Sequence, residues 1–313
     1  RIPGGFFKRE GRPTEKEILS SRIIDRSLRP LFDKSSRFDM QVMAEVVSSD
    51  QQNDSDVLGL IGASCAVNLS QIPFPGPVSA VRVGHIEGEY RVNPTVEEMA
   101  GSRLELVVAG TDDSILMVEG EANEASEEEI LGALQVAHEA IRQINSIQHE
   151  IVKALCKEKM TIVPKELHPE VWAAVEADAR GRAHELVRLG QKEERESGFE
   201  ALLEEMLAKH GEAFPEREGD IRSAVGKLER MEMREMVLAE KRRADGRGLS
   251  DIRPITCEVG VLPRTHGSAV FTRGQTQAMV VVTLGTSVDE QLIEELMGNS
   301  WKTFMLHYNF PPY

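Results

Sequence analysis

Cysteine and tryptophan are scarce in this chain of 313 residues, which contains three cysteines and two tryptophans. Cys65, Cys156 and Cys257 lie far apart, and neither a CxxC pair nor a Cys/His cluster occurs. An odd, scattered set of cysteines predicts no disulfide framework and no zinc site. Since disulfides are rare in the reducing cytosol, a cytoplasmic location fits this composition best.

The eight histidines are equally scattered, and none has metal-ligand spacing with another. Long apolar runs are also missing: no stretch approaches the roughly 20 apolar residues that cross a bilayer, and no signal peptide is visible. We therefore predict no metal site within these residues and no membrane partner. The first residue is Arg1 and not an initiator methionine, so we expect the chain to begin inside a longer protein.

The residues that are present predict a folded protein, because 41% are apolar and 28% are charged. The net charge of −15 argues against a non-specific nucleic-acid binder. Residues 1–30 depart from this acidic background, with eight lysines and arginines against four acidic residues, a net charge of +4. A local basic patch of this kind attracts a polyanion to one place.

Part of this patch is a row of arginines. Arg22, Arg26 and Arg29 stand at positions i, i+4 and i+7, and therefore share one face of a helix. One interpretation is a line of phosphate contacts along an RNA path. The other is a set of structural ion pairs, for which Asp25 is a nearby candidate partner. The sequence leaves both open.

The first half of the chain alternates helix and strand signals. Residues 1–13 are rich in glycine and proline and predict a loop. Thr14 and Glu17 form a capping box, which predicts a helix that ends near Pro30. A second capping box, Ser126 with Glu129, predicts a helix through 155. Between these, we expect a helix at 54–69 and strands at 41–47, 78–85, 90–92, 104–109 and 114–118.

The second half begins with a different pattern. Residues 171–240 carry regularly spaced leucines among many charges, which predicts an all-helical segment interrupted at Gly198, Gly211, Pro215 and Gly219. Residues 242–250 predict a turn-rich boundary. The strands expected after it are 255–260, 268–272 and 278–284, with one more at 301–308.

Four stretches in collinear order carry a family resemblance: GFFKREGRPTE at 5–15, SRIIDRSLRPLF at 21–32, LPRTHGSAVFTRGQTQ at 262–277 and HYNFPPY at 307–313. They resemble the polynucleotide phosphorylase family, in which a helical domain joins two RNase PH-like cores. The motifs are long and stand in the right order. The helical region, in contrast, resembles the family only in position and character.

The resemblance implies a fold of the α/β (α+β) class in three domains. These are an RNase PH-like core at 1–148 that lacks its N-terminal part, an all-α helical domain at 149–240, and the start of a second RNase PH-like core at 241–313. It also implies that the family's phosphate- and magnesium-binding residues lie beyond Tyr313. We therefore expect no phosphorolytic activity from this chain alone.

The implied activity is that of a 3′-to-5′ exoribonuclease, which uses inorganic phosphate to release nucleoside diphosphates from single-stranded RNA and can run in reverse. The resemblance also implies Mg²⁺ as a cofactor, a homotrimeric ring, a role in mRNA turnover, and RNA degradosome components as partners. Two alternatives stay open. One is a ring that guides RNA without cleaving it, and the other is a hydrolytic exonuclease that releases monophosphates.

The resemblance places an RNA-binding loop at Phe6, Phe7, Lys8, Arg9 and Arg12. Aromatic rings can stack on bases without sequence preference, and the neighbouring cations can hold phosphates. The two rings could instead be core anchors. Lys8 stands where the family usually has an arginine, so the planar fork that grips phosphate with two bonds is missing there.

His266, Ser268 and Arg273 resemble a catalytic cluster at first sight. Residues two apart on a strand point to the same side, so His266 and Ser268 could cooperate. No acidic partner is near in sequence, however, and such an arrangement depends on geometry. His266 is therefore a weak catalytic candidate, and the resemblance makes this stretch mainly part of the framework of the second core.

Overall fold

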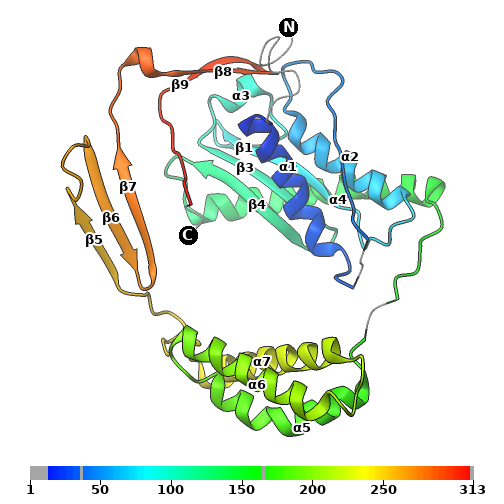
Figure 1. Ribbon diagram of the computed structural model, residues 1–313. Coiled ribbons are helices and arrows are strands. Elements are labelled where there is room, and N and C mark those ends of the chain that lie inside the picture. Colours follow the sequence, from blue (N-terminus) through cyan, green and yellow to red (C-terminus); the bar gives the residue numbers. More distant parts are fainter. Residues whose placement is uncertain (1–12, 36–37, 164–165, 311–313) are drawn as a thin grey trace. The chain divides into compact units, whose positions relative to one another are not determined.

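The computed structural model describes residues 13–35, 38–163 and 166–310 (Figure 1). The chain divides into two compact units, Arg1–Pro164 with Thr286–Tyr313, and Lys165–Gly285. The three-domain division predicted at 148 and 240 stays a prediction. None of the described helices is both long and apolar enough to cross a membrane.

Four antiparallel strands form the main sheet of the first unit, in the order β2-β1-β3-β4. Their bounds are β1 (Ser79–Ile86), β2 (Glu89–Val92), β3 (Leu104–Gly110) and β4 (Ile115–Ala122). The four predicted strands are confirmed, but β4 runs four residues beyond the predicted end at 118. Its last part, Glu119–Ala122, lacks the apolar pattern of a strand but pairs with β3 as far as Leu104.

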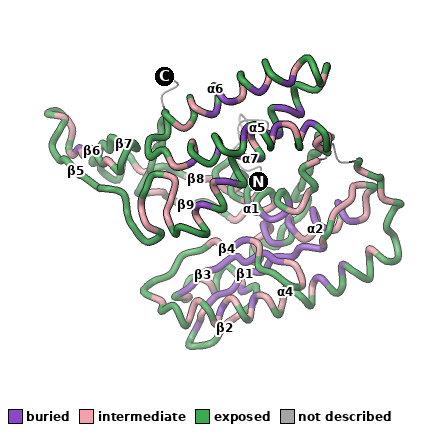
Figure 2. Tube along the Cα trace, turned by 90° about the horizontal axis from the view of Figure 1, so that it is seen from below, coloured by how far each residue is buried: buried purple, intermediate pink, exposed green. Residues whose placement is uncertain are grey.

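Helices cover both faces of this sheet. On one face, α1 (Glu15–Leu28) and α2 (Ser55–Leu69) pack against side chains that include Val78, Ala80, Val107 and Ala109. On the other face, α4 (Glu127–Leu155) packs against alternate residues of the same strands, including Val81, Val83, Leu106 and Val108. Figure 2 shows the buried residues following the strands between these helices. Each fully buried valine, leucine or isoleucine side chain stabilises this core by about 1.5–3 kcal/mol.

The predicted helix starts are confirmed by their caps. Thr14 Oγ1 accepts the backbone N–H of Glu17 at 3.2 Å, and the Glu17 carboxylate accepts the Thr14 N–H at 2.6 Å. Ser126 and Glu129 form the same reciprocal pair at the start of α4. A short helix that was not predicted, α3 (Val96–Met99), is capped in the same way by Thr95 and Glu98. A 3-10 turn, η2 (Arg29–Leu31), follows α1.

Two strand predictions are wrong. Residues 41–47 pair with no described strand, and Met43 and Val47 are 82% and 90% exposed. Of the strand predicted at 301–308, only the first two residues belong to a strand. The structure instead forms a hairpin of β8 (Gln291–Glu295) and β9 (Gly298–Lys302), which follows the 3-10 turn η3 (Ser287–Asp289). Local patterns indicate extended backbone, whereas a strand also requires a partner.

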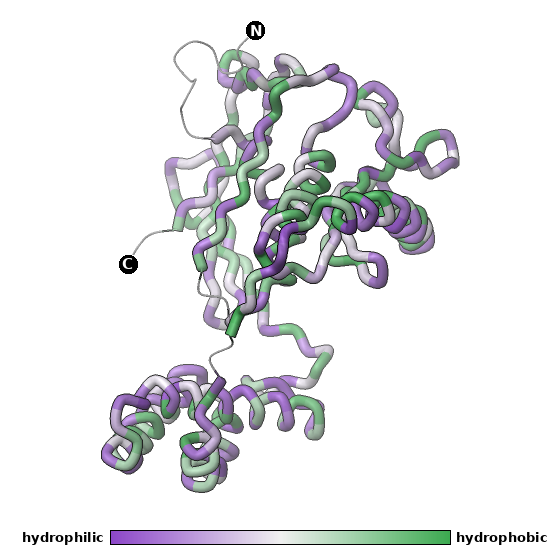
Figure 3. The backbone as a smooth tube through the Cα atoms, turned by 90° about the vertical axis from the view of Figure 1, so that its right-hand side faces the viewer, coloured by the Kyte–Doolittle hydropathy of each residue, from purple (hydrophilic) through white to green (hydrophobic). Residues whose placement is uncertain are grey.

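The second unit contains three helices, α5 (Pro169–Leu186), α6 (Lys192–His210) and α7 (Glu218–Glu240), which share one apolar core. Figure 3 shows hydrophobic and hydrophilic residues alternating along them. The predicted all-helical segment is confirmed, but Gly198 does not interrupt it. It lies inside α6, where a Cβ would collide with the Leu186 side chain of α5. The glycine permits close helix packing.

A three-stranded antiparallel sheet completes the second unit, in the order β5-β6-β7. Its strands are β5 (Ile255–Val259), β6 (Gly267–Arg273) and β7 (Thr276–Val282), close to the predicted ranges. Many of its apolar side chains are exposed, including Val259 at 82% and Met279 at 60%.

Candidate nucleic-acid interface

The predicted RNA-binding loop lies outside the described residues. This concerns Phe6, Phe7, Lys8, Arg9 and Arg12, whose role in binding RNA stays a prediction. The structure does describe α1 and η2, which follow the loop in the chain and carry the three predicted arginines.

All three arginines are exposed, Arg22 and Arg26 on α1 and Arg29 at the start of η2, but their environments differ. Arg29 donates from Nη2 and Nε to Asp25 Oδ1, at 2.6 and 2.8 Å. Arg26 forms an ion pair with Glu119 of β4. Arg22 has no ion pair with any residue that the structure describes. The ion pair of Arg29 with Asp25 is thus confirmed, and Arg26 pairs with Glu119, which is far away in the sequence. Contact of the three arginines with RNA stays a prediction.

This difference leads to a prediction for the full-length protein. Arg22→Gln is expected to weaken RNA binding and to reduce the slope of log affinity against log salt by about 0.7, the contribution of one single-strand phosphate. Arg26→Gln is expected to change the slope less, because Glu119 already compensates the charge of Arg26. Binding of homopolymeric RNA measured at several salt concentrations checks this. Equal slopes for both variants would contradict a special role for Arg22.

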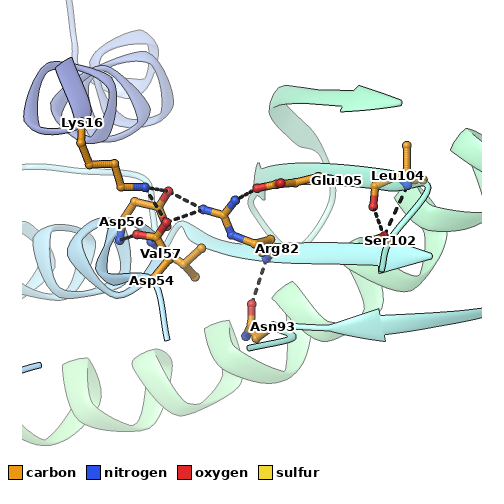
Figure 4. A network of polar contacts seen from close by, with 9 residues as sticks. All are labelled: Lys16, Asp54, Asp56, Val57, Arg82, Asn93, Ser102, Leu104 and Glu105. Atoms are coloured by element: carbon orange, nitrogen blue, oxygen red, sulfur yellow. Dashed lines mark hydrogen bonds and ion pairs between the residues drawn. The ribbon is translucent and has the colours of Figure 1, made fainter. Parts of the chain in front are cut away.

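An ionic network fixes the first turn of α1 to the rest of this unit (Figure 4). Lys16 Nζ of α1 lies 2.5 Å from Asp54 Oδ2 and 3.4 Å from Asp56 Oδ2. Arg82 Nη2 of β1 contacts the same two oxygens, at 3.2 and 2.6 Å. Its Nη1 pairs with Glu105 of β3. The network therefore joins α1, the start of α2, and two strands.

The two aspartates of the network are well shielded from water, with side-chain exposures of 20% for Asp54 and 4% for Asp56. Burial alone raises the pKa of Asp54, but the Lys16 hydrogen bond and the charges of Lys16 and Arg82 outweigh it, so the pKa lies below its ordinary value. Both carboxylates are thus held by cations. We interpret the network as the set of contacts that positions α1. It thereby also positions the N-terminal end of α1, which follows the predicted loop in the chain.

The weak catalytic candidate His266 has a structural contact. Its Nδ1 accepts the Leu284 N–H at 2.9 Å, and Ser268 Oγ accepts the Leu262 N–H at 2.9 Å. Both residues border an open depression of about 420 Å³ beside β6 and β7. Arg273 stands at the opposite end of β6, so the structure does not bring the three residues together. A catalytic role for His266 stays a prediction.

Known sequence families match this chain in three regions. The model of the 3′ exoribonuclease family, domain 1, matches residues 3–73 and 251–313, and that of domain 2 of the same family matches residues 76–140. The model described as the RNA binding domain of polyribonucleotide nucleotidyltransferase matches residues 170–248. The first of these models therefore matches on both sides of the helical segment.

Similar proteins match along the whole chain. A polyribonucleotide nucleotidyltransferase of Syntrophotalea carbinolica is 48% identical over 313 residues, and one of Heliobacterium modesticaldum is 46% identical over the same length. One of Ruegeria sp. is 46% identical over 319 residues. Each match covers 100% of this chain but only 44–45% of the relative. The chain therefore belongs to the polyribonucleotide nucleotidyltransferase family, and its fold combines RNase PH domains, a helical domain and the start of a second RNase PH core.

Proposed function

We propose that the full-length protein is a phosphorolytic exoribonuclease, which degrades single-stranded RNA from its 3′ end. Inorganic phosphate attacks the last phosphodiester, the new P–O bond forms, and the 3′ oxygen of the shortened RNA leaves. The product is a nucleoside diphosphate, so the bond energy is retained and the reaction runs in both directions. The observation that carries this proposal is the identity of 46–48% along the whole chain with polyribonucleotide nucleotidyltransferases.

This chemistry brings one anion against another and needs positive charge at the site. The exposed arginines of α1 and η2, together with the loop predicted before them, are proposed to supply positive charge along the RNA path and not at the bond that is cleaved. Mg²⁺ is part of the proposal for the full-length protein. The described residues offer no group of three or more His, Cys, Asp or Glu that could hold a metal ion. Asp54 and Asp56 already face Lys16 and Arg82.

The proposal extends to assembly and location. A homotrimeric ring would bring three copies of the loop that contains Phe6 and Phe7 around one RNA path. We further propose a cytoplasmic role in mRNA turnover, with RNA degradosome components as partners. The family model that matches residues 170–248 is described as RNA-binding, which supports RNA as the substrate class.

The reaction itself gives a direct prediction. The full-length protein should release nucleoside diphosphates from single-stranded RNA only when phosphate and Mg²⁺ are both present, because phosphate is the attacking group. Chromatography of the products after incubation with and without phosphate, and with a chelator, is the measurement. Monophosphates in phosphate-free buffer would show a hydrolytic enzyme instead. RNA binding without any product would favour a ring that only guides RNA.

A further inference from the structure

The charges of α7 are sorted onto different sides of the helix. Acidic residues on one side form ion pairs with arginines of α5 or of the residues just after it. Glu232 lies 2.9 Å from Arg180 Nε, and Glu235 lies 3.7 Å from the same guanidinium. Glu240 pairs with Arg188. These acids therefore help to fasten α7 to α5.

Three of the four cations of α7 lie on a different side; the fourth, Arg222, stands one turn and more before them. Lys227, Arg230 and Arg234 are exposed, and none forms an ion pair with a residue that the structure describes. They stand at i, i+3 and i+7 and therefore share one helix face. At a rise of 1.5 Å per residue they span about 10 Å along the helix. The exposed Glu229 points about 100° away from the neighbouring Arg230.

Two apolar residues complete this face. Met231 and Leu238 stand at i+4 and i+11 from Lys227, and they are 38% and 56% exposed. We name this set, Lys227, Arg230, Met231, Arg234 and Leu238, the α7 stripe. Arg230 and Arg234 are like charges at i, i+4, an arrangement that destabilises an isolated helix. Packing of the bundle does not require Arg230 and Arg234, because the apolar core lies on the side of Leu228 and Met236.

One cation of the stripe is held in place from α5. Lys227 Nζ lies over the ring of Trp172, 4.1 Å from the ring centre. A cation over an indole face is attracted by the ring quadrupole, and no carboxylate of the described residues forms an ion pair with this ammonium group. Lys227 is therefore oriented and still free to attract an anion.

We infer that the α7 stripe binds the backbone of single-stranded RNA, with Lys227, Arg230 and Arg234 contacting successive phosphates. This inference rests on the proposed function for its substrate. Charge complementarity supports it, because an unpaired cationic row on a protein with a net charge of −15 selects a polyanion locally. The match of residues 170–248 to an RNA binding domain model also supports RNA as the occupant.

The apolar members of the stripe favour a single strand over a duplex. Unstacked bases can lie against exposed apolar side chains, whereas the bases of a duplex are stacked inside the helix. Met231 follows Arg230 and Leu238 follows Arg234 along the same face, so base contacts can be interspersed with phosphate contacts along one strand.

The test is charge removal in the full-length protein. The stripe variant carries Lys227→Gln, Arg230→Gln and Arg234→Gln. The control variant carries Lys192→Gln, Lys209→Gln and Arg222→Gln, which removes the same charge from other parts of the same helical bundle.

Affinity for a long homopolymeric adenylate RNA is measured at several salt concentrations. The stripe variant should lose about 2 from the slope of log affinity against log salt, since three phosphates contribute roughly 0.7 each. The control should keep the slope of the wild type.

Two further measurements separate the possible outcomes. A variant with Lys227→Arg, Arg230→Lys and Arg234→Lys keeps the charges and should restore the slope, and thermal melts show whether each variant is folded. If the stripe variant does not fold, Arg230→Gln with Arg234→Gln replaces it, with an expected loss of about 1.4. Equal slopes in stripe and control variants would overturn the inference. A stripe variant with an unchanged slope but a changed oligomeric state would identify a protein contact instead.

Release of diphosphate from a short oligoadenylate is measured in parallel. If this release is absent in the wild type, the proposed function fails whatever the stripe does. If it is present and the slope does not change, only the inference about the stripe fails.

Discussion

Replacing Arg82 by methionine is expected to lower the free energy of unfolding by about 3–5 kcal/mol, the usual cost of removing one partner from a buried ion pair. Arg82 is 12% exposed and contacts Asp54, Asp56 and Glu105. The remaining cation, Lys16, lies 2.5 Å from Asp54 and 3.4 Å from Asp56 in the wild type. Asp56 therefore loses its nearest compensating cation, and its carboxylate is only 4% exposed.

Urea unfolding of the full-length protein and of its variants measures this loss. Arg26→Gln is the matched control, because it removes an arginine from an ion pair with exposures of 43% and 42%, which is worth about 0–1 kcal/mol. Adding Asp56→Asn to Arg82→Met should recover part of the stability, since the uncompensated buried charge disappears. A loss no larger than that of Arg26→Gln would show that the network does not hold this unit together.

The same variant should respond differently to acid. The pKa of Asp54 in the folded protein lies below its ordinary 3.8, so this carboxylate adds stability above that value and loses it as the pH falls through the folded pKa. Without Arg82 one of the charges that lowers this pKa is gone. The stability of Arg82→Met should therefore depend less steeply on pH below 3.8 than that of the wild type.

The parts of the fold that follow from neighbouring residues could be predicted from the sequence. Thr14 with Glu17 and Ser126 with Glu129 contain the whole capping interaction within three residues, and both helices start there. In the strands of the main sheet, successive side chains point to opposite faces, and the resulting two-residue pattern is visible in the sequence. The hairpin of β8 and β9 was missed and residues 41–47 were wrongly assigned, because pairing is decided by residues elsewhere in the chain.

The candidate site shows the same limit. The pair of Arg29 with Asp25 spans four residues and was foreseen as a candidate. Arg26 and Glu119 are 93 residues apart, so only the structure connects them. The α7 stripe could be predicted from the sequence only in part. Its helical spacing is visible in the sequence, but only the structure shows that Met236 is buried while Met231 is exposed.

Changing Phe6→Ala together with Phe7→Ala is expected to weaken binding of long RNA by the full-length protein with little change in its salt dependence. Stacking of one base on an aromatic ring contributes about 1–3 kcal/mol, so the loss of two rings corresponds to roughly 30-fold in Kd or more. Stacking releases almost no counterions. Arg9→Ala, in contrast, should weaken binding and reduce the salt slope by about 0.7.

Turnover of a short oligonucleotide separates this role from catalysis. Neither Phe6→Ala with Phe7→Ala nor Arg9→Ala should abolish it, because the loop is proposed to lie on the RNA path and not at the bond that is cleaved. The competing hypothesis makes both rings core anchors. In that case their loss would cost about 3–5 kcal/mol each, and the double variant would unfold. Thermal melts beside RNA binding therefore discriminate: a large drop in Tm with a proportional loss of binding would exclude stacking, whereas an unchanged Tm with weaker binding and an unchanged salt slope is the result that stacking requires.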